Sequence, residues 1–186
     1  MINSLFLDRD GVINKRIVGG YVTRLDEFIL EDGVLDAMVI FSRHFDHIFV
    51  VTNQQGIGKG LMTEADLAEI HGWFLQQVNA AGGRLDNIYH CPSLKNDHSF
   101  MRKPSIGMAL KAKKDYPDVA LHRSVMVGDT RSDMLFGRRA GMRTVLVGEE
   151  PEVARENHWL VDLYFDDLIS FANYLDTHEE IFFPTK

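Results

Sequence analysis

The chain alternates between short apolar runs and longer stretches in which apolar residues recur every three or four positions. The short runs are too brief for helices and apolar on both faces, which is typical of buried parallel strands. Strands are expected at residues 5–7, 48–51, 87–90, 124–127, 144–147 and 159–165, of which 87–90 is the weakest pattern and 159–165 an edge strand.

The periodic stretches predict amphipathic helices between these strands. Thr63 with Asp66 resembles a capping box at the start of one helix, and Pro104 is well placed to begin another. Helices are expected at residues 34–44, 63–81, 104–116, 132–140 and 168–175. The alternation predicts an α/β fold, a doubly wound, Rossmann-like sheet of five or six mostly parallel strands, in a single domain spanning residues 1–186.

Composition narrows the class of protein. With 186 residues, 45% of them hydrophobic and 25% charged, the chain is long enough for one well-packed core and short for two. It contains no apolar run of membrane-spanning length and no secretory leader, so we expect a soluble, cytoplasmic protein without a membrane partner. The net charge of −7 argues against nucleic-acid binding and suggests no protein partner, so we expect a monomer. A single cysteine excludes an internal disulfide.

Three of the predicted strands end in polar residues. In a strand alternate side chains share a face, so Asp8 and Asp10 project to the same side, and Gly11 lets the backbone turn away. Ligands of open α/β sheets bind outside the carboxyl ends of the strands. The side chains expected to meet there are Asp8, Asp10, Thr52, Asn53, Lys103, Asp129 and Asp133. Several carboxylates, a hydroxyl and an ammonium in one place suit Mg²⁺ bridging a phosphate.

These residues carry a resemblance to a known family. The strings at 8–14, 51–54, 102–104 and 128–133 resemble, in order, the four motifs of the haloacid dehalogenase (HAD) superfamily of phosphohydrolases. The longer strings at 8–14, 52–60 and 102–107 are similar to the histidinol-phosphatase-like branch, and most closely to the heptose 1,7-bisphosphate 7-phosphatase family.

The resemblance implies a division of labour between the first two aspartates. Asp8 is the expected nucleophile, forming an aspartyl-phosphate, and Asp10 the acid that protonates the leaving oxygen and then the base that activates water. Mg²⁺ is expected on the Asp8 carboxylate, the Asp10 backbone carbonyl and Asp129.

The remaining motif residues are expected to contact the transferring phosphoryl group or to orient the groups that contact it. Thr52 and the backbone at Asn53 would hydrogen-bond its oxygens, and Lys103 would neutralise their charge. Asp133 would orient Lys103 or a metal-bound water.

The intervals between the motifs leave no room for a cap domain, so we expect an open site. Selectivity would come from a flap at 19–21, from the turn after the second strand and from the arginines beside the motif residues. The candidate substrate contacts are Arg9, Gly19, Tyr21, Asn53, Gln54, Gln55 and Arg102.

The chain departs from the resembled family at its zinc loop. The family pattern is Cys-X-His followed by Cys-X-Cys, and here those positions read Cys91, Ser93, Ser99 and Met101. One ligand of four cannot make a tetrahedral site, and the neighbouring histidines at 90 and 98 are weak substitutes. We therefore predict no structural zinc.

The sequence thus predicts a Mg²⁺-dependent phosphatase acting on a phosphorylated small molecule, with the 7-phosphate of heptose 1,7-bisphosphate as the first candidate. Histidinol phosphate or another small phosphate ester is the alternative substrate. A receiver-like module that senses phosphate without turnover is the alternative of another class, although the presence of both Asp8 and Asp10 argues against it.

Overall fold

The computed structural model describes residues 2–148 and 158–182, which form one six-stranded sheet with helices on both faces. All five pairings between neighbouring strands are parallel, in the order β3-β2-β1-β4-β5-β6. The strands are β1 (Ile2–Leu7), β2 (Phe45–Asn53), β3 (Asn87–Cys91), β4 (Ser124–Gly128), β5 (Arg143–Val147) and β6 (Leu163–Phe165). This is the order of a doubly wound sheet whose direction of winding reverses beside β1, and it confirms the predicted fold class.

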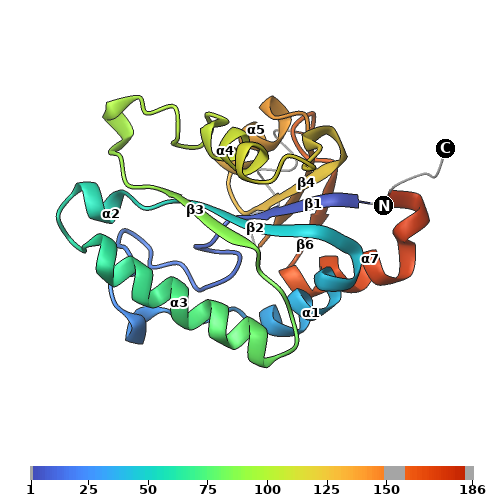
Figure 1. The fold of residues 1–186 in the computed structure, drawn as a ribbon, viewed down its shortest axis with the longest axis horizontal. Coiled ribbons are helices and arrows are strands. Elements are labelled where there is room, and N and C mark those ends of the chain that lie inside the picture. The colour runs from blue at the N-terminus through green and yellow to red at the C-terminus, as the bar shows by residue number, and fades with distance from the viewer. Residues whose placement is uncertain (1, 149–157, 183–186) are drawn as a thin grey trace.

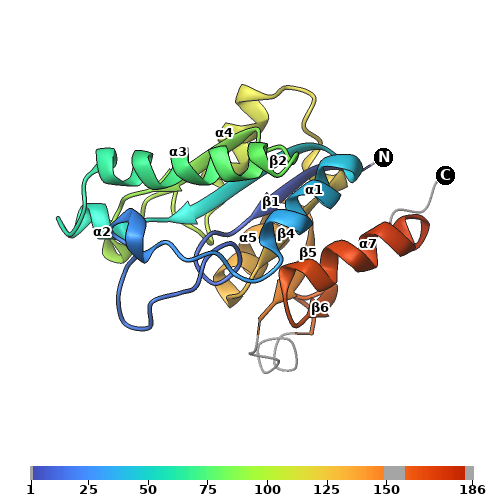
Figure 2. The same ribbon diagram turned by 90° about the horizontal axis from the view of Figure 1, so that it is seen from below.

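The helices divide between the two faces, as Figures 1 and 2 show. The lower face in Figure 1 carries α1 (Val34–His44), α3 (Glu64–Ala80) and α7 (Leu168–Phe182), and the upper face carries α4 (Gly107–Asp115) and α5 (Arg131–Arg139). Shorter elements are α2 (Gln55–Gly58) and the 3₁₀ turns η1 (Leu25–Glu27), η2 (Lys95–Asp97) and η3 (Leu121–Arg123).

Alternation along each strand sends side chains into two separate cores. Leu5 and Leu7 of β1 face the cluster under α1, α3 and α7, whereas Phe6 between them faces the cluster under α4 and α5. All three side chains are fully buried. The central strands are therefore fixed from both faces, and their carboxyl ends are held rigidly at one edge of the sheet.

Most predicted elements are present, and the differences have local causes. The capping box at Thr63 and Asp66 is formed in both directions and begins α3. The helix expected from Pro104 instead begins at Gly107, since its amide bonds to the Phe100 carbonyl and folds the preceding residues into turns. That part of the prediction was wrong.

The ends of the chain differ from the prediction in length. The last strand covers only Leu163–Phe165, because Leu160 turns inward to pack between α5 and β5 and its carbonyl accepts the Thr144 hydroxyl. The last helix runs on to Phe182 with a non-helical residue at His178. No cap domain is inserted between the described elements, and none of the described helices has the length and apolarity to cross a bilayer.

Candidate active site

The polar ends of β1, β2 and β4 meet at one pocket of about 970 Å³. The predicted residues that line it are Asp8, Arg9, Asp10, Gly19, Tyr21, Thr52, Asn53, Gln54, Gln55, Arg102, Lys103 and Asp133. Asp129 lies beside the pocket: its carboxylate, with those of Asp8 and Asp133, forms a group of oxygens all within 4.8 Å of one another. Because β1, β2 and β4 are neighbours in the sheet, residues that are far apart in the sequence lie close together.

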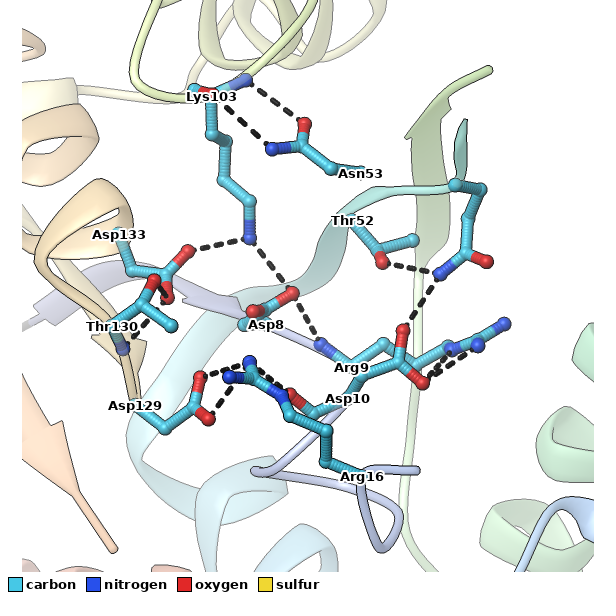
Figure 3. A network of polar contacts seen from close by, with 11 residues as sticks. Asp8, Arg9, Asp10, Arg16, Thr52, Asn53, Lys103, Asp129, Thr130 and Asp133 are labelled. Atoms are coloured by element: carbon cyan, nitrogen blue, oxygen red, sulfur yellow. Dashed lines mark hydrogen bonds and ion pairs between the residues drawn. The ribbon is translucent and has the colours of Figure 1, made fainter. Parts of the chain in front are cut away.

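Lys103 reaches from the turn before α4 into the middle of this group (Figure 3). Its ammonium nitrogen lies 2.7 Å from an Asp8 oxygen and 2.7 Å from an Asp133 oxygen, with the side chain 1% exposed. Burial alone would lower the pKa of Lys103, but Asp133 and Asp8 outweigh it and raise that pKa. Lys103 therefore carries its charge inside the protein and partly balances two carboxylates.

Asp133 is held by the start of its own helix. Its second carboxylate oxygen accepts hydrogen bonds from the Thr130 amide and hydroxyl, which completes a capping box at the start of α5. One oxygen therefore closes the helix while the other faces Lys103. That Asp133 orients Lys103 during the reaction stays a prediction.

The three carboxylates of this acidic group outnumber the two cations that contact them, Lys103 and Arg16. Burial, followed by repulsion from Asp133, raises the pKa of Asp8 to about 6 against the opposing effect of Lys103. Burial, followed by repulsion from Asp8, raises the pKa of Asp129 to about 8. Carboxylates so crowded favour a further cation.

Asp10 is in a different environment, although it lies two residues from Asp8. Its carboxylate accepts hydrogen bonds from the Arg9 guanidinium at 2.7 Å, from Asn14 at 3.0 Å and from Gln54 at 2.9 Å. Burial opposes its ionisation, but Arg9 and these amides outweigh burial and hold the pKa of Asp10 below its ordinary value. The two neighbouring aspartates are thereby tuned in opposite directions.

Arg9 lines the pocket and supports Asp10. Its side chain is 1% exposed, and its guanidinium carbon lies 5.5 Å from the centre of the Phe28 ring. That Arg9 also contacts the substrate stays a prediction. The sequence analysis did not single out Asn14 or Arg16; the former lies four residues from Asp10, within the first motif, which was the available signal.

Known proteins share this architecture. A HAD-hydrolase-like family model matches residues 100–170. The D-glycero-alpha-D-manno-heptose-1,7-bisphosphate 7-phosphatase of Campylobacter jejuni is 38% identical over 148 residues, covering 79% of this chain and 83% of the relative. The chain belongs to this heptose-bisphosphate phosphatase family. The D-glycero-beta-D-manno-heptose-1,7-bisphosphate 7-phosphatase of Helicobacter pylori is 31% identical over 158 residues, covering 84% of this chain and 89% of the relative.

A solved structure extends the likeness to three dimensions. The D,D-heptose 1,7-bisphosphate phosphatase from B. bronchiseptica, crystallised with magnesium and phosphate, matches with a TM-score of 0.84 at 30% identity, covering 93% of this chain and 97% of that one. The resemblance read from the four motifs is confirmed, and the chain is a phosphatase of the HAD superfamily.

The last residue of β2, Asn53, is tied to the turn before α4. The Asn53 amide donates to the Lys103 carbonyl at 3.2 Å, and its oxygen accepts the Lys103 amide at 3.0 Å. This pair of bonds sets where the Lys103 side chain begins. Thr52, 1% exposed, accepts a hydrogen bond from Gln54 at 2.7 Å, so the same glutamine amide contacts both Thr52 and Asp10.

The expected flap is a turn beside the pocket mouth. Gly20 donates to the Ile17 carbonyl, and the Tyr21 hydroxyl accepts a bond from Gln55 at 2.6 Å. The ammonium of Lys59 lies 5.0 Å from the Tyr21 ring. Arg102 donates to the Ser93 carbonyl at 3.1 Å. Both Tyr21 and Arg102 line the pocket, where a substrate can reach them.

In the loop at the position of the family's zinc pattern, the side chains contact one another and neighbouring residues. Cys91 is fully buried, with its sulfur 3.8 Å from the Ser99 hydroxyl, and His90 pairs with Glu64 at 2.8 Å. Two positions of the resembled zinc pattern therefore lie side by side, with the sulfur of one facing the hydroxyl of the other. That the protein holds no zinc stays a prediction.

Proposed function

We propose that this protein is a Mg²⁺-dependent phosphomonoester hydrolase that removes the 7-phosphate of D-glycero-D-manno-heptose 1,7-bisphosphate. The observation that carries the proposal is a pair of aspartates of opposite character at one pocket. Asp8 contacts the Lys103 ammonium, and Asp10 is held separately by Arg9, Asn14 and Gln54. Family membership supports the substrate.

The acidic group fits a magnesium ion. Mg²⁺ prefers hard oxygen ligands, and three carboxylates lie within 4.8 Å of one another where positive charge is lacking. We propose that the Asp8 carboxylate, the Asp10 backbone carbonyl and Asp129 hold it. When bound, the ion would neutralise phosphoryl charge and orient the phosphate.

In the first step an Asp8 oxygen attacks phosphorus, the bond from phosphorus to the ester oxygen breaks, and Asp10 gives its proton to that leaving oxygen. Lys103 steadies the charge on the phosphoryl oxygens because its ammonium already lies 2.7 Å from Asp8. Thr52, at the end of the neighbouring strand, offers a hydroxyl to the same group.

In the second step water attacks the aspartyl-phosphate, Asp10 takes the water proton, and Asp8 and inorganic phosphate are released. The lowered pKa of Asp10 in the free protein keeps this carboxylate ionised, so it is free to accept the proton. For the first step Asp10 needs a proton, which the negative charge of the bound phosphate favours.

The pocket also supports a bisphosphate. Tyr21, Gln55 and Arg102 line the same pocket, and they offer hydroxyl, amide and guanidinium donors to the sugar or its second phosphate. The similar proteins include phosphatases named for the alpha anomer and for the beta anomer of the heptose bisphosphate. Which anomer this protein prefers is therefore a question for measurement. We further propose action as a cytoplasmic monomer on a phosphorylated small molecule, consistent with the net charge of −7.

The test is phosphate release with Mg²⁺ across a substrate panel. It contains both anomers of heptose 1,7-bisphosphate, histidinol phosphate and simple sugar phosphates, with Asp8→Asn as the blank. A preference for one bisphosphate anomer, lost in the blank, supports the proposal. Preference for histidinol phosphate moves the substrate assignment, and failure to release phosphate from every compound favours a phosphate-sensing module instead.

A further inference from the structure

Arg16 occupies the position at which two of the proposed metal ligands meet. One nitrogen of its guanidinium donates to the Asp10 backbone carbonyl at 2.9 Å and to an Asp129 oxygen at 2.9 Å, and lies 2.8 Å from the other Asp129 oxygen. Figure 3 shows the guanidinium between these two groups, on the opposite side of Asp8 from Lys103. A cation therefore already joins the carbonyl and the carboxylate.

The backbone brings these groups together. Gly11 has a φ of 92°, and a side-chain carbon there would lie 2.2 Å from an Asp129 oxygen and 3.4 Å from Arg16 Nε. The first motif can approach Asp129 this closely because residue 11 has no side chain. The backbone fold thus brings the Asp10 carbonyl close to Asp129, and Arg16 contacts both groups.

Lys103 and Arg16 contact different carboxylates of the acidic group. Lys103 contacts Asp8 and Asp133 and is buried, whereas Arg16 contacts Asp129 and is 43% exposed. An ion pair with one exposed partner is weak because solvent screens it. Arg16 can therefore leave at small cost, while Lys103 cannot.

We propose that Arg16 is an internal counter-ion that holds Asp129 and the Asp10 carbonyl in the metal-free protein and is displaced when Mg²⁺ binds. This inference rests on the proposed function, because it takes the metal ligands from there. The guanidinium stays charged at all physiological pH, so it competes with the ion at every working pH. The exchange raises the Mg²⁺ concentration at which the enzyme becomes loaded, and it keeps the ligand pair assembled until then.

The test compares Mg²⁺ affinity by titration calorimetry at low salt in wild type, Arg16→Gln, Arg16→Lys and Arg24→Gln. Arg24 is a matched control: it lies in the same segment, is 68% exposed and pairs with Asp26 and Glu27. We expect Arg16→Gln to bind Mg²⁺ about fivefold more tightly, from the strength of one exposed ion pair. Arg16→Lys is expected in between, because it keeps the positive charge on a shorter side chain. Arg24→Gln should match wild type.

Thermal unfolding gives a second readout. Metal-free Arg16→Gln should melt at a lower temperature than metal-free wild type, and the two should agree once loaded with Mg²⁺. Equal or weaker Mg²⁺ binding by Arg16→Gln would overturn the inference while leaving the proposed function standing. If wild type itself bound no Mg²⁺, both the inference and the metal-dependent function would fall, so the two failures are distinguishable.

Discussion

The ammonium nitrogen of Lys103 lies 2.7 Å from a carboxylate oxygen of Asp8, and both side chains are buried. The same ammonium contacts Asp133 at 2.7 Å, so one cation serves two carboxylates. A charge buried in this way costs stability when either partner is lost, and it is available to a phosphoryl group from the start. Stability and catalysis therefore depend on the same atom.

Replacing Lys103 by Met should impair both properties. We expect a loss of about 3–5 kcal/mol of unfolding free energy, because two buried carboxylates lose their cation. The double variant Lys103→Met with Asp133→Asn should recover part of that stability but none of the activity, since the ammonium remains absent. Denaturant unfolding and phosphate release on the same preparations check this, and normal turnover by either variant would contradict it.

Replacing Asp10 by Asn should slow turnover by about 10²–10⁴, because the acid and the base are removed while the side-chain shape is kept. Asp26→Asn, on an exposed carboxylate in the same segment, is the control and should be unaffected. Rapid-quench measurement of the aspartyl-phosphate separates the two steps. An Asp10→Asn protein as fast as wild type would remove the role assigned to Asp10.

The metal-free protein should lose stability as the pH rises. Asp8 and Asp129 have folded-state pKa values of about 6 and about 8, both raised from 3.8 first by burial and then by repulsion, from Asp133 at Asp8 and from Asp8 at Asp129. The folded state therefore binds these protons more tightly than the unfolded state, and the stabilisation is lost as the pH rises through those values. Melting temperatures in chelator should fall between about pH 5 and about pH 8.

Two comparisons isolate the cause of that pH dependence. Asp129→Asn should remove most of the slope, because it removes the larger of the two raised pKa values. Saturating Mg²⁺ should reduce the slope in wild type, since the cation favours the ionised carboxylates. A metal-free stability that rises over the same range would show that the acidic group is not short of positive charge.

Purified protein should contain no tightly held zinc. The end of β3 offers Cys91 and the loop after it offers Ser99; their sulfur and oxygen lie 3.8 Å apart, and a neutral hydroxyl is a poor zinc ligand. Elemental analysis is expected to find far less than one zinc per chain, and a zinc-selective chelator should leave the melting temperature unchanged. One tightly bound zinc per chain would contradict this.

Local sequence determined the elements and the motif residues. Strands and helices were predictable where hydrophobic periodicity and capping were strong, as at Thr63 and Asp66, because such signals depend on neighbours along the chain. They failed at Pro104, where contacts with Phe100 and Asn53 from outside the helix set its start. The motif strings identified most of the acidic and basic residues at the centre of the pocket, but not Arg16, which also lines it.

Only the tertiary structure decided how those residues are paired. The sequence placed Asp8 and Asp10 two residues apart, but it gave no sign of their opposite pKa shifts. Burial and Asp133 of α5 raise the pKa of Asp8, whereas at Asp10 burial is outweighed by Arg9, with Asn14 and Gln54, which lower the pKa of Asp10. The contact of Arg16 with Asp129 likewise has no local signal. Charge balance in a buried site depends on which chain segments lie close together, and the order of strands in the sheet decides that. The spacing of residues along the sequence does not reveal this order.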